Sequence, residues 1–236
     1  MPRKLPTSPA SATSTSTDAL REQALLLGHR GARRYAPENT IAAFELALAH
    51  GCDGFEFDVR LTADRRCVIC HDPRLAGLDL ETSRYHQLPP GTPCLPDVLE
   101  KFAARAFLDI ELKVSGLEND VAAMVRDHPP QRGYFISSFL RQVIERLGAT
   151  DETLPLGLIC DSQRQLAAWT RLPIQALFLE RRLVTGAIVE ALHAANKKVF
   201  VWTVNRERDM RRFAQLAVDG IISDDTKLLA ETFFSR

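Results

Sequence analysis

The sequence has no long apolar run and no excess charge of either sign. The chain of 236 residues carries 30 basic and 30 acidic residues, so its formal net charge is zero. A neutral balance argues against a surface that coats nucleic acid or adheres broadly to anionic membranes. The apolar runs fall far short of the ~20 residues that a membrane-spanning helix needs. We therefore expect no nucleic-acid partner and no stable membrane insertion.

Residues 1–22 lack the apolar central stretch of a secretory signal and are rich in Ser, Thr, Pro and Ala. This composition predicts a disordered leader, with a transit peptide as the alternative, ahead of one domain over 23–236. The five cysteines are odd in number and mostly stand in apolar contexts, as is typical of reduced thiols in a cytoplasmic protein. Cys67 and Cys70 have the C-x-x-C spacing, but residues three apart on a strand point to opposite faces. We expect both thiols to pack in the core.

From residue 23 onward, short apolar runs alternate with amphipathic helical patterns. The expected strands cover 24–28, 53–59, 107–113, 134–137, 156–160, 176–179, 198–204 and 220–223, with a hairpin through 63–66 into a further strand that ends at His71. The expected helices cover about 39–50 (Asn39 as N-cap, Gly51 as C-cap), 96–104, 117–127, 140–147, 163–170, 186–195, 207–216 and 226–233. Eight such units predict a single-domain (β/α)₈ barrel of the α/β class. A doubly wound open sheet is the competing architecture, but no glycine-rich phosphate fingerprint follows the first strand.

Carboxylates stand near the ends of two of these strands, where the active site of such a barrel forms. Glu56 and Asp58 are two residues apart and project to one face, as do Glu111 and Lys113. Buried carboxylates are costly unless they are paired or bound to metal. The three acids therefore predict a site for a divalent metal ion, Mg²⁺, Ca²⁺ or Mn²⁺ rather than zinc. The alternative is a buried ion network with Lys113 and Arg30.

Two histidines, His29 and His71, each follow an apolar strand directly. Imidazole exchanges protons near pH 7, so one histidine can accept the proton of the attacking group while the other protonates the leaving oxygen. Arg30 and Lys113 supply positive charge that would stabilise phosphoryl oxygens. This combination favours a small phosphate-bearing substrate over a neutral one.

Two residues near the C-terminus have less specific patterns. Trp202 is expected either to form an apolar wall of the substrate pocket or to pack in the core. Asp224 belongs either to the polar residues at the strand ends or, as we prefer, to the last helix as its N-cap.

Blocks of residues over nearly the whole chain after the leader resemble the glycerophosphodiester phosphodiesterase family. They are His29-Arg30-Gly31, Pro37-Glu38-Asn39-Thr40, Gly51-x-Asp53-x-x-Glu56-x-Asp58-Val59, Thr62-x-Asp64, His71-Asp72-Pro73, Asp109-Ile110-Glu111-Leu112-Lys113, Ser137-Ser138-Phe139, Val201-Trp202-Thr203-Val204-Asn205 and Gly220-Ile221-Ile222-Ser223-Asp224. The resemblance implies a TIM barrel that hydrolyses glycerophosphodiesters to glycerol 3-phosphate and an alcohol. By the same resemblance the metal ligands are Glu56, Asp58 and Glu111, the acid–base pair is His29 and His71, and the substrate contacts are Arg30, Lys113 and Trp202.

The chain departs from the family pattern in two places. Residues 74–93 form a short loop-like segment where many members carry a larger insertion that caps the barrel mouth, so we expect an open mouth. Asp224-Asp225-Thr226 stands where the family usually has a proline soon after the aspartate. An open mouth favours lysophospholipids as the alternative substrate, and a phosphate-ligand binding protein without turnover is the alternative outside the enzymes. Direct attack by water and a cyclic phosphate intermediate both remain compatible with these residues.

Overall fold

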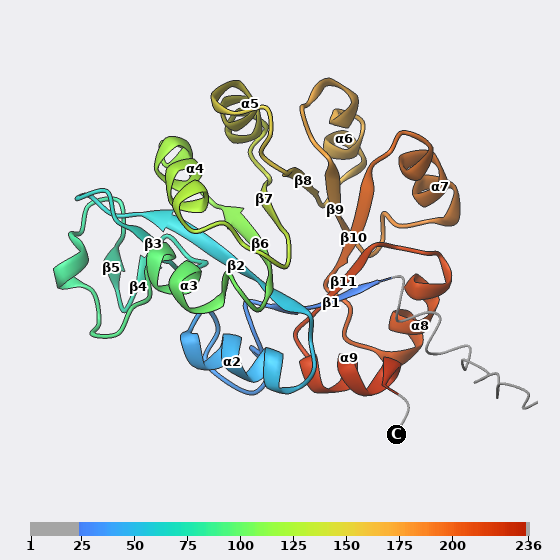
Figure 1. Cartoon of the computed structure of the whole chain (residues 1–236), viewed down its shortest axis with the longest axis horizontal. Helices are drawn as coiled ribbons and strands as arrows, with labels where there is room; N and C mark the ends of the chain where they lie inside the picture. Colours follow the sequence, from blue (N-terminus) through green and yellow to red (C-terminus); the bar gives the residue numbers. More distant parts are fainter. Residues whose placement is uncertain (1–23, 235–236) are drawn as a thin grey trace, which may run out of the picture.

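Eight parallel strands close into a barrel in the computed structural model, which describes residues 24–234 (Figure 1). The strands in barrel order are β1 (Leu25–His29), β2 (Gly54–Leu61), β6 (Phe107–Leu112), β7 (Tyr134–Ser138), β8 (Leu156–Cys160), β9 (Ala176–Glu180), β10 (Lys198–Trp202) and β11 (Gly220–Ser223). Because β1 pairs in parallel with both β2 and β11, the sheet has no open edge within this ring. The (β/α)₈ prediction is confirmed, and the open sheet is excluded. The expected leader over 1–22 lies outside the described residues.

Helices form the outer layer around the strands (Figure 1). They are α2 (Ile41–Ala49), α3 (Leu95–Phe102), α4 (Glu118–Asp127), α5 (Arg141–Thr150), α6 (Gln163–Leu166), α7 (Gly186–Ala194), α8 (Glu207–Gln215) and α9 (Thr226–Phe233), with 3₁₀ turns η1 (Tyr85–Gln87) and η2 (Trp169–Arg171). The single helix expected over 163–170 is wrong, because η2 follows α6 as a separate turn. Of the helices within residues 24–234, none has the length and apolar character needed to cross a bilayer.

The start of α2 differs from the sequence prediction in a way that matters for the site. Thr40 is the N-cap, since its hydroxyl accepts a hydrogen bond from the Ala43 amide. Asn39 has a left-handed backbone with φ 58°, and its side-chain amide donates to Asp58 Oδ2 at 2.7 Å. The expected N-cap thus orients a buried carboxylate instead. Gly51, with φ 99°, ends the helix as expected.

Residues 74–93 form more structure than the expected loop. Strand β3 (Cys67–Ile69) pairs antiparallel with β2, and β4 (Arg74–Leu75) pairs with β5 (Leu78–Asp79) in a short hairpin. Together with η1, these elements bury a small apolar cluster of Val68, Cys70, Leu80, Leu88 and Cys94. We call residues 67–94 the mouth lobe. Cys67 packs in the main core whereas Cys70 packs in the lobe, so the expected divergence of the two thiols is confirmed.

The interior of the barrel is filled by aromatic rings towards the amino ends of its strands. Phe178 and Phe200 stack with their ring centroids 4.6 Å apart, and Phe107 and Phe135 complete the cluster. Two inward glycines make room for these rings, because a Cβ atom on Gly157 or Gly220 would lie 2.4 or 2.3 Å from the nearest ring atom. Only the carboxyl end of the barrel is therefore left for a polar cavity.

Candidate active site

A cavity of about 180 Å³ lies at the carboxyl ends of the barrel strands. Its polar lining consists of His29, Arg30, Glu56, His71, Asp109, Glu111 and Lys113. Its apolar lining consists of Phe139, Ile159, Phe178, Trp202 and Ile222. Every side chain that the sequence marks as a site residue lines this cavity except Asp58, which is fully buried beside it.

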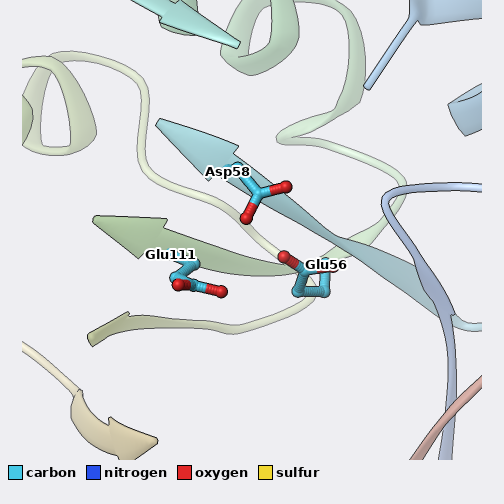
Figure 2. Close-up of side chains that lie close together, drawn as sticks. All are labelled: Glu56, Asp58 and Glu111. Carbon is cyan, nitrogen blue, oxygen red and sulfur yellow. The ribbon is translucent and has the colours of Figure 1, made fainter. Parts of the chain in front are cut away.

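Three carboxylates from two neighbouring strands converge at this cavity (Figure 2). Glu56 and Asp58 project from β2, and Glu111 projects from β6, where it pairs in register with Asp58. One oxygen from each carboxylate lies within 4.8 Å of the others. Glu56 Oε1, Asp58 Oδ1 and Glu111 Oε1 are buried and accept no hydrogen bond from the described residues. A buried all-oxygen cluster of this kind fits a hard divalent cation.

The charges of this cluster are only partly balanced by nearby cations. Lys113 Nζ forms ion pairs with Glu111 Oε1 at 2.6 Å and with Asp58 Oδ1 at 3.4 Å. Arg30 Nε lies 3.3 Å from Asp58 Oδ2, and its Nη1 donates to Glu38 at 2.8 Å. The ion network that the sequence left as an alternative is thus formed. However, the two cations, Arg30 and Lys113, do not balance the charge of the three carboxylates.

The pKa values of the carboxyls reflect this excess of negative charge. Burial, followed by repulsion from Asp58 and Glu111, raises the pKa of Glu56 well above its usual value. Burial and the Asp58 charge also raise the pKa of Glu111 to about 7, although Lys113 opposes the shift. A bound divalent cation would favour the ionised form of each group and remove the repulsion.

His29 is held by the carboxylate of Asp224, which the sequence analysis preferred as the N-cap of the last helix. Its Nδ1 lies 2.6 Å from Asp224 Oδ1, and its Nε2 lies 4.0 Å from Glu56 Oε2. Asn205 fixes this carboxylate by donating from Nδ2 to Asp224 Oδ2 at 2.6 Å and by accepting from the Asp224 amide. Burial lowers the pKa of His29, and the hydrogen bond and charge of Asp224 oppose that shift.

The expectation that Asp224 is the N-cap of the last helix is therefore wrong. Asp225 caps α9 by accepting from the Leu228 amide at 3.1 Å. The sequence contained a usable signal, because the residue after an inward-facing strand of a barrel lies at its mouth. Closure of the barrel then brings the end of β11 beside β1, with Ser223 in register with Gly28.

His71 reaches the cavity from the mouth lobe. Its Nδ1 lies 2.7 Å from Asp72 Oδ1, and its backbone carbonyl accepts from Arg60 Nε at 2.7 Å. The hydrogen bond and charge of His71 lower the pKa of Asp72. The cavity is therefore bordered by two histidines, each with its Nδ1 beside an aspartate.

Trp202 fits both of its expected positions. It is half-buried and lines the cavity, while its indole N–H donates to the Phe178 carbonyl at 3.0 Å. Its ring also packs edge-to-face on Phe139, with centroids 5.7 Å apart. Asp109 and Phe139 line the cavity although the sequence gave them no role there.

Comparison with known proteins agrees with this geometry. The model of the glycerophosphoryl diester phosphodiesterase family matches residues 29–80 and 81–228. The chain is 29% identical over 232 residues to the glycerophosphodiester phosphodiesterase of Caldanaerobacter subterraneus subsp. tengcongensis, covering 87% of this chain and 96% of that one. It is 32% identical over 244 residues to the probable glycerophosphodiester phosphodiesterase 2 of Mycobacterium tuberculosis, covering 90% and 91%.

A solved structure shares the fold. It is that of an Oleispira antarctica phosphodiesterase in complex with the product sn-glycerol-3-phosphate, with a TM-score of 0.81 and 23% identity over 92% of this chain and 99% of that one. The match of the family model over most of the chain, together with relatives of about 30% identity, decides the assignment. The chain belongs to the glycerophosphoryl diester phosphodiesterase family of enzymes.

Proposed function

We propose that the chain hydrolyses glycerophosphodiesters to glycerol 3-phosphate and an alcohol, with a divalent metal ion and histidine acid–base catalysis. The observation that carries this proposal is the set of three buried carboxylate oxygens without hydrogen bonds, in one cavity with two histidines. The names of the relatives and the product bound to the Oleispira antarctica enzyme support the substrate class. The five free cysteines favour a cytoplasmic setting.

Glu56, Asp58 and Glu111 would hold the metal ion as Mg²⁺, Ca²⁺ or Mn²⁺. When bound, such an ion would supply Lewis-acid polarisation of the phosphoryl group. Lys113 and Arg30 lie against the same carboxylates and present positive charge to phosphoryl oxygens, whose negative charge grows in the transition state. These contacts orient the phosphate over the centre of the cavity.

Proton transfer falls to the two histidines. With Nδ1 of His29 engaged by Asp224, Nε2 is the nitrogen left to exchange a proton with the reacting group. His71 stands at the rim, and its Nδ1 is engaged by Asp72 in the same manner. One histidine accepts the proton of the attacking oxygen, and the other gives a proton to the departing alcohol. Trp202 and Phe139 form the apolar wall against the carbon chain of the substrate.

The proposal is tested with a panel of phosphodiesters assayed with Mg²⁺, Ca²⁺, Mn²⁺ and a chelator. We expect hydrolysis of glycerophosphocholine that requires a metal ion and falls by about 10²–10⁴-fold in His29→Ala and in His71→Ala. His128→Ala is the control, because this exposed histidine lies outside the cavity. Activity that survives complete chelation would refute the metal mechanism, and near-normal rates in both variants would refute the acid–base pair. Metal binding without turnover on any diester would instead support a binding protein.

A further inference from the structure

Asp109 is a cavity residue that neither the metal cluster nor the acid–base pair uses. Its side chain is 1% exposed, yet it lines the cavity. The Ser137 hydroxyl donates to Oδ1 at 2.6 Å and thereby fixes the carboxyl orientation. The other oxygen, Oδ2, has no hydrogen-bond partner among residues 24–234. Because Asp109 lines the cavity, this second carboxyl oxygen can accept a hydrogen bond from a donor on a ligand.

The position of Asp109 separates it from the metal cluster. It precedes Glu111 by two residues on β6, which places it about 7 Å further towards the amino end of the strand. It pairs in register with Glu56 on one side and with Phe135 on the other. Asp109 is not among the carboxylates that come within 4.8 Å of one another. On β6 it therefore lies below Glu111, at the register of Glu56, and outside the three-carboxylate cluster.

The cavity is closed beneath this level. Three of its lining residues, Ile159, Phe178 and Ile222, belong to the apolar cluster inside the barrel, and we call them the cavity floor. Phe200 stacks on Phe178, so aromatic rings fill the barrel beneath the floor. Asp109 offers a single polar acceptor at the level of an otherwise apolar floor.

We propose that Asp109, positioned by Ser137, accepts a hydrogen bond from the free terminal hydroxyl of the substrate's glycerol end. This inference rests on the proposed function and specifies how the same cavity recognises the glycerol end of its substrate. The glycerol end enters first and reaches down to Asp109, and the second ester of the phosphate faces the mouth and His71. The site thus selects a glycerol with an unmodified terminal hydroxyl, and it imposes little selection on the departing alcohol.

This arrangement separates glycerophosphodiesters from lysophospholipids. In a lysophospholipid with its acyl group on the terminal oxygen, that oxygen has no hydrogen to donate to Asp109. The acyl chain would also have to pass the closed floor, and a cavity of about 180 Å³ has no room for it.

The test compares three substrates on the full chain with saturating metal ion. They are glycerophosphocholine, its analogue without the terminal hydroxyl (propane-1,2-diol phosphocholine), and a short-chain lysophosphatidylcholine below its micelle concentration. We expect kcat/KM for glycerophosphocholine to exceed that for the analogue by about 10- to 100-fold, because a buried acceptor loses its donor. We expect lysophosphatidylcholine to be cleaved still more slowly.

Variants locate the effect. Asp109→Ala should lower kcat/KM far more on glycerophosphocholine than on the analogue, so that the ratio falls towards one. Ser137→Ala should lower the ratio in part. Ser138→Ala is the matched control, because this equally buried serine on β7 bonds the Leu112 carbonyl instead and should leave the ratio unchanged.

Equal wild-type rates on glycerophosphocholine and the analogue would overturn the inference, and this measurement does not depend on any variant folding. An unchanged ratio in a folded Asp109→Ala protein would also overturn it. If the wild type hydrolyses none of the three diesters, the proposed function itself fails. Hydrolysis without discrimination removes only the role of Asp109, so the two failures can be distinguished.

Discussion

Replacing Asp224 by Asn tests whether this carboxylate positions His29 for proton transfer. The substitution keeps the volume of the side chain and leaves the backbone contact with Asn205 in place. It removes the charge that lies 2.6 Å from His29 Nδ1. An amide can also present its N–H₂ group to Nδ1, which would favour the tautomer that carries its proton on Nε2.

The expected loss follows from the strength of this contact. A hydrogen bond that involves a charged group contributes about 1.5–3 kcal/mol. At about 1.36 kcal/mol for each factor of ten, this corresponds to a fall in kcat of about 10- to 100-fold. KM should stay near the wild-type value, because Asp224 lies behind His29 and not against the substrate.

The assay is a double-mutant cycle on glycerophosphocholine hydrolysis with Asp224→Asn, His29→Ala and the combined variant. Because Asp224 acts through His29, adding Asp224→Asn to His29→Ala should cause no further loss. Asp225→Asn is the control, since this neighbouring carboxylate caps α9 and asparagine is also a good N-cap. A combined variant whose loss equals the product of the two single losses would refute the reasoning.

Three further outcomes are expected. Glu111→Gln should raise the metal concentration for half-maximal activity by about tenfold or more, because ligand charge sets the affinity of such sites, and titration with Mg²⁺ and Ca²⁺ measures it. Gly54→Ala should destabilise the fold by ~3 kcal/mol, read by denaturant unfolding, because its Cβ atom would lie 1.9 Å from the Phe107 carbonyl oxygen. Burial opposes ionisation of Asp219, but hydrogen bonds from Lys198, the Val199 amide and His193 hold its pKa below the usual value. This carboxylate therefore stabilises the native state above about pH 4 and loses that contribution as the pH falls through the lowered pKa, so Asp219→Asn should flatten the acid side of the stability profile.

The strand pattern predicted most of the barrel and the core of the site. All eight barrel strands occur within two residues of their expected bounds, because alternation along a strand depends on neighbours that are close in sequence. The same alternation places Glu56 and Asp58 on one face of β2, and Glu111 inward on β6. The roles of these carboxylates as metal ligands come from the resemblance to the family, and they stay predictions.

The sequence did not predict the contacts between segments that are far apart in the chain. A carboxylate just before a helix has a strong local reason to be its N-cap, so Asp224 was assigned to α9 and Asn39 to α2. In the structure Asp225 and Thr40 take those positions. Likewise, a small apolar cluster stabilises the mouth lobe, and no periodic pattern in the sequence predicts this cluster.

By itself, the sequence determined the eight βα units and the inward direction of three carboxylates, because both follow from short-range periodicity. Only the tertiary structure decided that Asp224 holds His29, 195 residues away, and that Asp109 lines a cavity with an apolar floor. The physical reason is closure of the barrel. It sets β11 beside β1 and packs the inward rings against one another, and neither contact is encoded within a single segment of the chain.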